Sequence, residues 1–107
     1  MPSSRYEVEL TPQAEKDLKR LRPWVDQATR AILELEADPF RGHTLAGSLK
    51  GTRSLEFSLR AGGAYRAVYL ILEEERTCLV FLIGPHENIY ERAERRVAAL
   101  RRSGRLA

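Results

Sequence analysis

The sequence contains little sulfur and no long apolar segment. Cys78 is the single cysteine among 107 residues, so an internal disulfide is excluded. It lies in an apolar alternating run, and we expect it to be an inert thiol in the core. The longest apolar runs, residues 67–72 and 78–83, each span about six residues, whereas a membrane-spanning helix needs about 20. The sequence therefore predicts no membrane-spanning segment and no membrane partner.

Motifs for metals, nucleotides and export are also missing. The two histidines and the one cysteine are scattered without the spacing of metal ligands, which predicts no metal site. No glycine-rich phosphate-binding loop occurs, and the adjacent glycines Gly62-Gly63 are typical of a hairpin turn. We therefore expect no cofactor. The first residues, Met-Pro-Ser-Ser-Arg-Tyr, lack the apolar segment of a signal peptide. We therefore expect a cytoplasmic protein.

The chain does contain enough apolar material for a packed domain. Hydrophobic residues make up 43% of the sequence and charged residues 31%, without the bias that marks disordered proteins. A chain of this length is typical of one domain. We expect a single domain over residues 1–107.

Positive charge is concentrated in the middle and the C-terminal part of the chain. Residues 41–72 carry five basic side chains and one acidic side chain, and residues 84–107 carry six arginines and three glutamates. Residues 1–40 instead hold six basic and eight acidic groups. Such segregation is typical of proteins that bind polyanions, because neutralised phosphates release counterions. The simpler interpretation is that arginine-rich helices keep the protein soluble.

The N-terminal third predicts a strand followed by two helices. Residues 5–10 alternate between polar and apolar side chains, as in a half-buried strand. Thr11 and Pro12 then supply a capping hydroxyl and a proline at the first helical position. This helix ends near Pro23, and a second amphipathic helix begins at Val25 and ends before Asp38-Pro39. Two helices joined so closely predict an antiparallel hairpin.

The remaining sequence predicts a β-meander and a C-terminal helix. Residues 40–51 contain three glycines and are typical of a loop. Residues 54–60, 65–72 and 77–83 show strand patterns separated by short turns, which predicts three consecutive antiparallel strands. Apolar residues then follow at helical spacing, at Ile89, Ala93, Val97 and Leu100. The other face of this helix carries Arg92, Arg95, Arg96 and Arg102.

This order of elements, taken with five short segments, resembles the RelE/ParE superfamily of bacterial toxin–antitoxin toxins. The segments are YEVELTPQAEKDL at 6–18, DP at 38–39, LAGSLKG at 45–51, YRAVY at 65–69 and IGPHENIY at 83–90. Each is short, but together they extend from Tyr6 nearly to Val97. The resemblance implies an α+β fold with an N-terminal strand, a helical hairpin packed on a twisted antiparallel sheet of about four strands, and a C-terminal helix.

The resemblance also implies an activity and partners. Members of the RelE branch enter the ribosomal A site and cleave mRNA, whereas members of the ParE branch poison DNA gyrase. Both are held inactive by an antitoxin whose disordered arm folds over the toxin surface. We therefore expect a cognate antitoxin, the ribosome and mRNA as partners, with operator DNA contacted only through the antitoxin.

RNA cleavage without a metal needs a proton acceptor, a cation for the phosphorane and a proton donor. Arg66 is the candidate cation, because it interrupts an apolar strand and a guanidinium binds phosphate through two donors. In the family, an arginine in the matching Tyr-Arg-x-x-Tyr segment contacts the scissile phosphate. The alternative role for Arg66 is an ion pair with Glu56 across the sheet.

His86 and Tyr90 are the candidate proton-transfer and stacking groups. Counted back from Tyr90, His86 occupies the place where relatives have an arginine or a histidine, and histidine side chains change charge near neutral pH. The resemblance implies that Tyr90 stacks on a base or donates a proton. Without the resemblance, His86 is an ordinary exposed residue and Tyr90 a core aromatic residue.

Glu56 and Ser58 depart from the family pattern. They fall where ribosome-dependent relatives often place lysines, so phosphate affinity and a possible base are lost. Glu56 itself is a candidate acceptor for the 2′-OH proton if it is buried beside Arg66. The same departure favours a toxin without nuclease activity.

Four further basic residues are candidate contacts for ribosomal RNA, with a solvated surface as the alternative: Arg41, Lys50, Arg53 and Arg60. Three functions remain open on the sequence. The first is a ribosome-dependent mRNA endonuclease, the second a ParE-like gyrase inhibitor without catalysis, and the third an inactive protein that acts only in an antitoxin–DNA repressor complex. Convergence of Arg66, His86 and Tyr90 in an open basic concavity would favour the first.

Overall fold

Strand β1 (Glu7–Leu10) leads directly into helix α1 (Pro12–Lys19). The computed structural model describes residues 5–60 and 62–105. The Thr11 side chain accepts a hydrogen bond from Ala14 N at 3.1 Å, and Pro12 is the first helical residue, as the sequence predicts. Helix α2 (Val25–Leu33) follows and continues into the 3-10 helix η2 (Glu34–Glu36).

The predicted meander is formed by β3 (Arg53–Ser58), β4 (Ala64–Leu72) and β5 (Thr77–Pro85), which pair antiparallel in sequence order. Gly62 and Gly63 connect the first two strands with φ values of 96° and 89°, a backbone region that favours glycine. Helix α3 (Ile89–Arg102) ends the regular structure. The predicted α+β fold class, with a strand at the N-terminal end and a helix at the C-terminal end, is confirmed.

The sheet differs in two details from the predicted antiparallel sheet of about four strands. It has five strands in the order β1-β5-β4-β3-β2, and β2 (His43–Thr44) lies in the segment predicted as a loop, ahead of the 3-10 helix η3 (Gly47–Leu49). Strand β1 pairs in parallel with β5. An alternating pattern marks a strand but does not identify its neighbour, and no hairpin turn sets the direction of β1 because two helices follow it.

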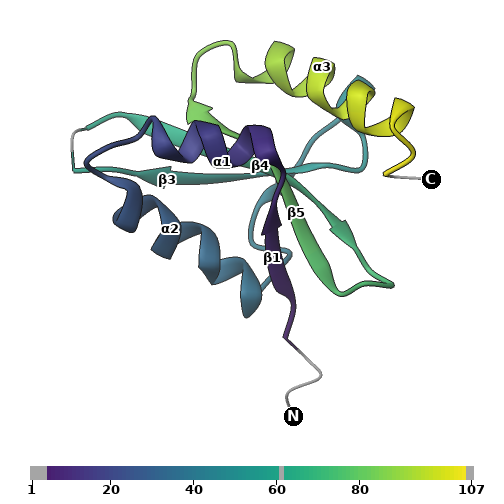
Figure 1. Ribbon diagram of the computed structural model, residues 1–107, viewed down its shortest axis with the longest axis horizontal. Helices are drawn as coiled ribbons and strands as arrows, with labels where there is room; N and C mark the ends of the chain where they lie inside the picture. Colours follow the sequence, from purple (N-terminus) through teal and green to yellow (C-terminus); the bar gives the residue numbers. More distant parts are fainter. Residues whose placement is uncertain (1–4, 61, 106–107) are drawn as a thin grey trace.

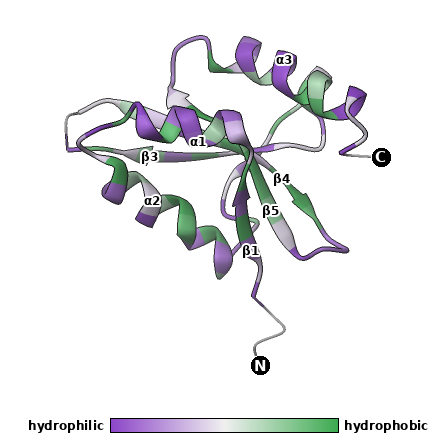
Figure 2. Ribbon diagram, in the orientation of Figure 1, coloured by the Kyte–Doolittle hydropathy of each residue, from purple (hydrophilic) through white to green (hydrophobic). Residues whose placement is uncertain are grey.

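Helices cover both faces of the sheet (Figure 1). Helices α1 and α2 pack on one face, through residues that include Ala14, Ala28 and Ile32. Helix α3 packs on the other face through Ile89, Ala93 and Val97. Figure 2 shows strongly hydrophobic stretches on the central strands β4 and β5, which contribute side chains to both cores. Within the described residues, no helix is both long and apolar enough to cross a membrane.

Cys78 lies in the core on the α1–α2 side, where the sequence predicts it. Its side chain is fully buried, and burial raises the pKa of the thiol to about 11. Because the thiolate is the reactive form, this position disfavours thiol chemistry.

Tyr69 on β4 ties the loop before β2 to the sheet. Its buried hydroxyl donates to Pro39 O at 2.6 Å and accepts from Gly42 N at 3.0 Å. A Cβ atom at Gly42 would lie 2.9 Å from the Tyr69 ring and 2.9 Å from Ser54 O, so only glycine fits this approach. Burial raises the pKa of the Tyr69 hydroxyl above its ordinary value.

We expect Tyr69→Phe to lower the free energy of unfolding by about 1–3 kcal/mol, because Gly42 N–H and Pro39 C=O then lose a buried partner. Urea denaturation followed by circular dichroism measures the change. Tyr65→Phe is the matched control, since Tyr65 lies on the same face of β4 and is only partly buried. Equal losses in the two variants would contradict the assigned role of the Tyr69 hydroxyl.

A buried carboxylate joins α1, β5 and α3. Asp17 is 3% exposed and accepts a hydrogen bond from Ile83 N at 3.0 Å. Ile83 lies on β5 beyond the four residues that pair with β1. Arg96 of α3 donates to both carboxylate oxygens of Asp17 and to Phe81 O. This network fixes the position of α3 relative to β5.

Candidate functional site

The candidate site lies on the α3 side of the sheet, beside the start of α3. Arg66 is two residues before Val68, which packs against α3, and side chains two residues apart in a strand share a face. Strand register places Arg66 between Glu56 on β3 and Gly84 on β5. The sheet therefore carries the predicted cation in its central strand, with a carboxylate beside it.

The side chains of Arg66, His86 and Tyr90 converge. Arg66 Nε donates to His86 Nδ1 at 2.7 Å, and the guanidinium carbon lies 5.8 Å from the centre of the Tyr90 ring, a cation–π contact. His86 is fixed by its backbone N–H, which donates to Ala64 O at 3.1 Å. Asn88, with φ of 57°, turns the chain into α3 and so brings Tyr90 back over the sheet.

The hydrogen bond between Arg66 and His86 has a defined direction. A guanidinium can only donate, so Nδ1 of His86 is the acceptor in this hydrogen bond. The His86 residue is exposed, so a ligand can approach the imidazole.

Glu56 is the fourth predicted catalytic residue, and it lies next to this cluster. Its Oε1 is 4.0 Å from Arg66 Nη2, and its side chain is 49% exposed, whereas that of Arg66 is 14% exposed. Glu56 thus lies beside Arg66 but is not buried, so one of the two conditions under which the sequence makes it a candidate proton acceptor is met. The sequence offers an ion pair with Glu56 as the alternative role of Arg66. This pair is present at 4.0 Å, in addition to the contacts of Arg66 with His86 and Tyr90.

Ser54 is a site residue that the sequence analysis missed. Its hydroxyl oxygen accepts a hydrogen bond from Arg66 Nη1 at 3.3 Å, and it is fully buried. The strand alternation could have identified it, because Ser54 and Glu56 are two residues apart and so share a face of β3. Ser54 holds the buried end of the guanidinium.

Two of the four predicted ribosome contacts, Arg53 and Arg41, make contacts within the protein. Arg53 donates to Gly42 O and Phe40 O and covers the Phe40 ring, so it holds the loop before β3. Arg41 pairs with Glu34 at 3.1 Å. Lys50 is exposed just after η3, and Arg60 is exposed beyond the end of β3. Of these four, Lys50 and Arg60 have exposed side chains for which no ion pair is recorded among the described residues.

No group of three or more His, Cys, Asp or Glu side chains within residues 5–60 and 62–105 is placed to hold a metal ion. The candidate site itself offers the cation, the imidazole, the phenol and the carboxylate described above.

Residues 8–94 match the model of the ParE-like toxins of type II bacterial toxin–antitoxin systems. The chain belongs to this toxin family. The family match covers both the sheet and the first turns of α3, so it includes Arg66, His86 and Tyr90. The predicted relationship to the RelE/ParE superfamily is confirmed. A comparison with curated protein sequences found no significant match.

Solved toxin structures share this fold. The toxin–antitoxin complex RelBE2 from Mycobacterium tuberculosis contains a chain with 28% identity and a TM-score of 0.64, covering 77% of this chain and 99% of its own. A mutant of E. coli RelE in complex with a peptide of its antitoxin gives 26% identity and a TM-score of 0.61, covering 83% of this chain and 94% of its own. A mutant of E. coli RelE in the free state gives 22% identity and a TM-score of 0.66, covering 90% and 98%, and shows likeness of fold alone.

Proposed function

We propose that this toxin is a ribosome-dependent endonuclease that cleaves mRNA in the ribosomal A site and so inhibits translation. The observation that carries the proposal is the cluster of Arg66, His86 and Tyr90, held within hydrogen-bonding or cation–π distance on one face of the sheet. Cleavage of RNA by 2′-OH attack needs a cation and a proton donor, for which Arg66 and His86 are the candidates, and an aromatic ring beside them suits a base.

Arg66 is the proposed phosphate ligand. Attack of the 2′ oxygen on phosphorus forms a phosphorane with more negative charge on its oxygens than the ground state. A guanidinium anchored by Ser54 at one nitrogen can present its remaining donors to these oxygens. The charge of Arg66 thereby stabilises the transition state more than the substrate.

Proton transfer is assigned to Glu56 and His86. The O2′–P bond forms and the P–O5′ bond breaks, so the 2′-OH must lose one proton and the 5′ oxygen must gain one. The Glu56 carboxylate accepts the first proton. When Arg66 turns to the phosphate, Nδ1 of His86 is released and takes up a proton from solvent, and the imidazolium then donates from Nε2 to the 5′ oxygen.

Tyr90 is the proposed stacking group. Its side chain is 38% exposed at the start of α3, so one surface of the ring is open to a base. Aromatic stacking on single-stranded bases is the common mode of RNA recognition. Tyr90 positions the nucleotide next to the scissile phosphate.

A cognate antitoxin is the proposed inhibitory partner. The related RelBE2 structure from M. tuberculosis is a toxin–antitoxin complex, and so is the E. coli RelE complex with a RelB peptide. We expect the antitoxin of this chain to bind the toxin directly and to carry the contacts with operator DNA.

Primer extension on a defined mRNA in a reconstituted translation system tests the proposed function. We expect cuts within the A-site codon with the wild type and none with His86→Ala, while mRNA without ribosomes stays intact. Cleavage that is unaffected in His86→Ala would contradict the role assigned to the imidazole. Intact mRNA with the wild type would exclude the endonuclease.

A second candidate function is gyrase inhibition without catalysis. The observation that favours it is Glu56, which is half exposed, lies 4.0 Å from Arg66 and reduces the positive charge of the site. A DNA supercoiling assay with purified gyrase distinguishes the two functions. Arrested supercoiling with intact mRNA supports the gyrase inhibitor, and inactivity in both assays supports a protein that acts only with its antitoxin on DNA.

A further inference from the structure

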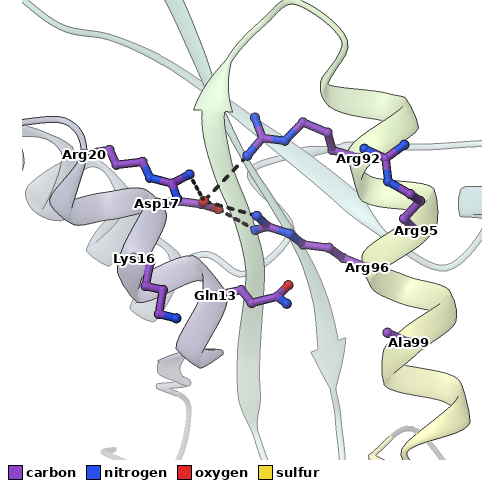
Figure 3. A pocket seen from close by; sticks show the side chains of 8 residues that line it. All are labelled: Gln13, Lys16, Asp17, Arg20, Arg92, Arg95, Arg96 and Ala99. Atoms are coloured by element: carbon purple, nitrogen blue, oxygen red, sulfur yellow. Dashed lines mark hydrogen bonds and ion pairs between the residues drawn. The ribbon is translucent and has the colours of Figure 1, made fainter.

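A basic cleft lies between α1 and α3, outside the candidate site. Its volume is about 460 Å³, and five cations and one carboxylate line it together with Gln13 and Ala99 (Figure 3). The six charged residues are Lys16, Asp17, Arg20, Arg92, Arg95 and Arg96. Figure 3 shows Arg20, Arg92 and Arg96 directed at the single carboxylate of Asp17 from two helices.

Helix packing turns the two basic faces toward each other. On α3, Ile89, Ala93 and Val97 pack on the sheet, which directs the stripe of Arg92, Arg95 and Arg96 toward α1. On α1, Lys16 and Arg20 are four residues apart and share a face. Arg92, Arg95 and Arg96 are therefore part of a cleft and not simply the solvated side of a helix.

The cleft holds more positive charge than its own carboxylate neutralises. Asp17 accepts three hydrogen bonds from Arg96 and Ile83 N–H, and the guanidinium nitrogens of Arg92 and Arg20 lie farther away, at 3.6 and 3.9 Å. Arg95 and Lys16 have no ion pair recorded among the described residues. Asp17 is the one acidic side chain that lines this cleft within the described part of the chain. Cations gathered in this way repel each other unless an anion joins them.

Arg92 connects the cleft to the candidate site. Its Nη1 lies 3.1 Å from the position that a Cβ atom on Gly84 would occupy, and Gly84 pairs with Arg66 across β4 and β5. Positive charge thus continues from Arg66 past Gly84 into the cleft. A chain of phosphates that reaches Arg66 would meet the cleft next.

We propose that the α1–α3 cleft binds the phosphodiester backbone of RNA, beside the nucleotide held at Arg66. This assignment rests on the proposed function for its choice of RNA as the ligand. Arginine binds phosphate oxygens through two donors, which suits a cleft with four arginines. Arg96 and Arg92 are held by Asp17, whereas the 73% exposed Arg20 and the exposed Arg95 and Lys16 close around the phosphates.

Fluorescence anisotropy of a labelled single-stranded RNA 12-mer over a series of salt concentrations tests the cleft. The double variant Arg20→Ala/Arg95→Ala removes two cations that make no hydrogen bond with Asp17. We expect about tenfold weaker binding at low salt, and a plot of log K against log [salt] whose slope is smaller by about 1.4, since each lost phosphate contact contributes about 0.7. The matched control is Arg30→Ala/Arg102→Ala, which removes the same charge from exposed positions outside the cleft.

Equal RNA binding by the cleft variant and the control would overturn the proposal, as would undetectable RNA binding by the wild type. A labelled poly-glutamate peptide is a second probe. If the cleft variant loses affinity for this peptide and not for RNA, the occupant is an acidic polypeptide, which also overturns the proposal. Thermal unfolding of both double variants checks that the fold is retained.

The binding assay contains no ribosome and does not depend on cleavage. Loss of RNA affinity in Arg20→Ala/Arg95→Ala, together with wild-type protein that cuts no mRNA, would support the cleft and contradict the endonuclease alone. Normal mRNA cleavage by the wild type, together with RNA affinity that Arg20→Ala/Arg95→Ala leaves unchanged, would contradict the proposal for the cleft and leave the endonuclease standing.

Discussion

Replacing Arg66 with alanine is expected to lower the rate of mRNA cleavage by about 10²–10³-fold, the usual cost of losing one group that stabilises transition-state charge. The structure gives the physical reason. Arg66 is 14% exposed and is held by Ser54 and His86, so its charge has a fixed position in the site. The observed cleavage rate on ribosomes carrying a defined A-site codon, measured at saturating toxin, isolates this effect from weaker binding.

The variant Arg66→Lys separates the effect of the charge from that of the guanidinium geometry. A lysine keeps the charge but cannot donate to two phosphate oxygens in the planar geometry of a guanidinium, so we expect partial activity, between that of the wild type and Arg66→Ala. Arg30→Ala, an exposed arginine on α2, serves as the control for loss of one positive charge. If Arg66→Ala cleaves as fast as Arg30→Ala, the proposed role of Arg66 is wrong.

Local signals in the sequence predicted most of the fold. Thr11 and Pro12 determine the start of α1 through contacts within one helical turn, and these are visible in the sequence. The meander was predictable because its strands are consecutive. The parallel pairing of β1 with β5 was not, since its partners are about 70 residues apart, as Glu7 and Thr77 are. The two-residue strand β2 is too short to show a pattern.

In the candidate site too, local features could be predicted from the sequence, whereas contacts between distant segments could not. Arg66 was recognisable because a charge interrupts an apolar strand, and the family resemblance singled out His86 and Tyr90. Their convergence depends on tertiary structure, since the residues of the Arg66–His86 hydrogen bond are 20 positions apart. The contacts of Arg53 were hidden from the sequence for the same reason, because its guanidinium donates to backbone carbonyls 11 and 13 positions away.

The role of Asp17 was the least accessible to the sequence. In the sequence it is one more acidic residue in a charged helix, and the hydrogen bonds to Ile83 and Arg96 span 66 and 79 positions. Only the folded chain brings an unpaired strand edge, an arginine of α3 and this carboxylate together. Charged residues inside an otherwise amphipathic helix therefore need the tertiary structure before a role can be given to them.

Asp17→Ala is expected to lower the free energy of unfolding by about 3–5 kcal/mol, because removal of one partner leaves a desolvated charge without compensation. Its side chain is 2% exposed and that of Arg96 is 19% exposed, so water cannot replace the lost carboxylate fully. Ile83 N–H also loses its acceptor. Small domains are stable by about 5–15 kcal/mol in total, and we expect the midpoint of urea denaturation to fall steeply.

Two comparisons identify the cause of this loss. Arg105→Ala breaks ion pairs with Glu9 and Glu75 at 3.1 and 3.6 Å that are largely exposed, so it should cost at most about 1 kcal/mol. The double variant Asp17→Ala/Arg96→Met should be less destabilised than the sum of its single variants, because it leaves no buried charge unpaired. Additive losses, or an Asp17→Ala variant as stable as Arg105→Ala, would show that the carboxylate does not hold α3 to the sheet.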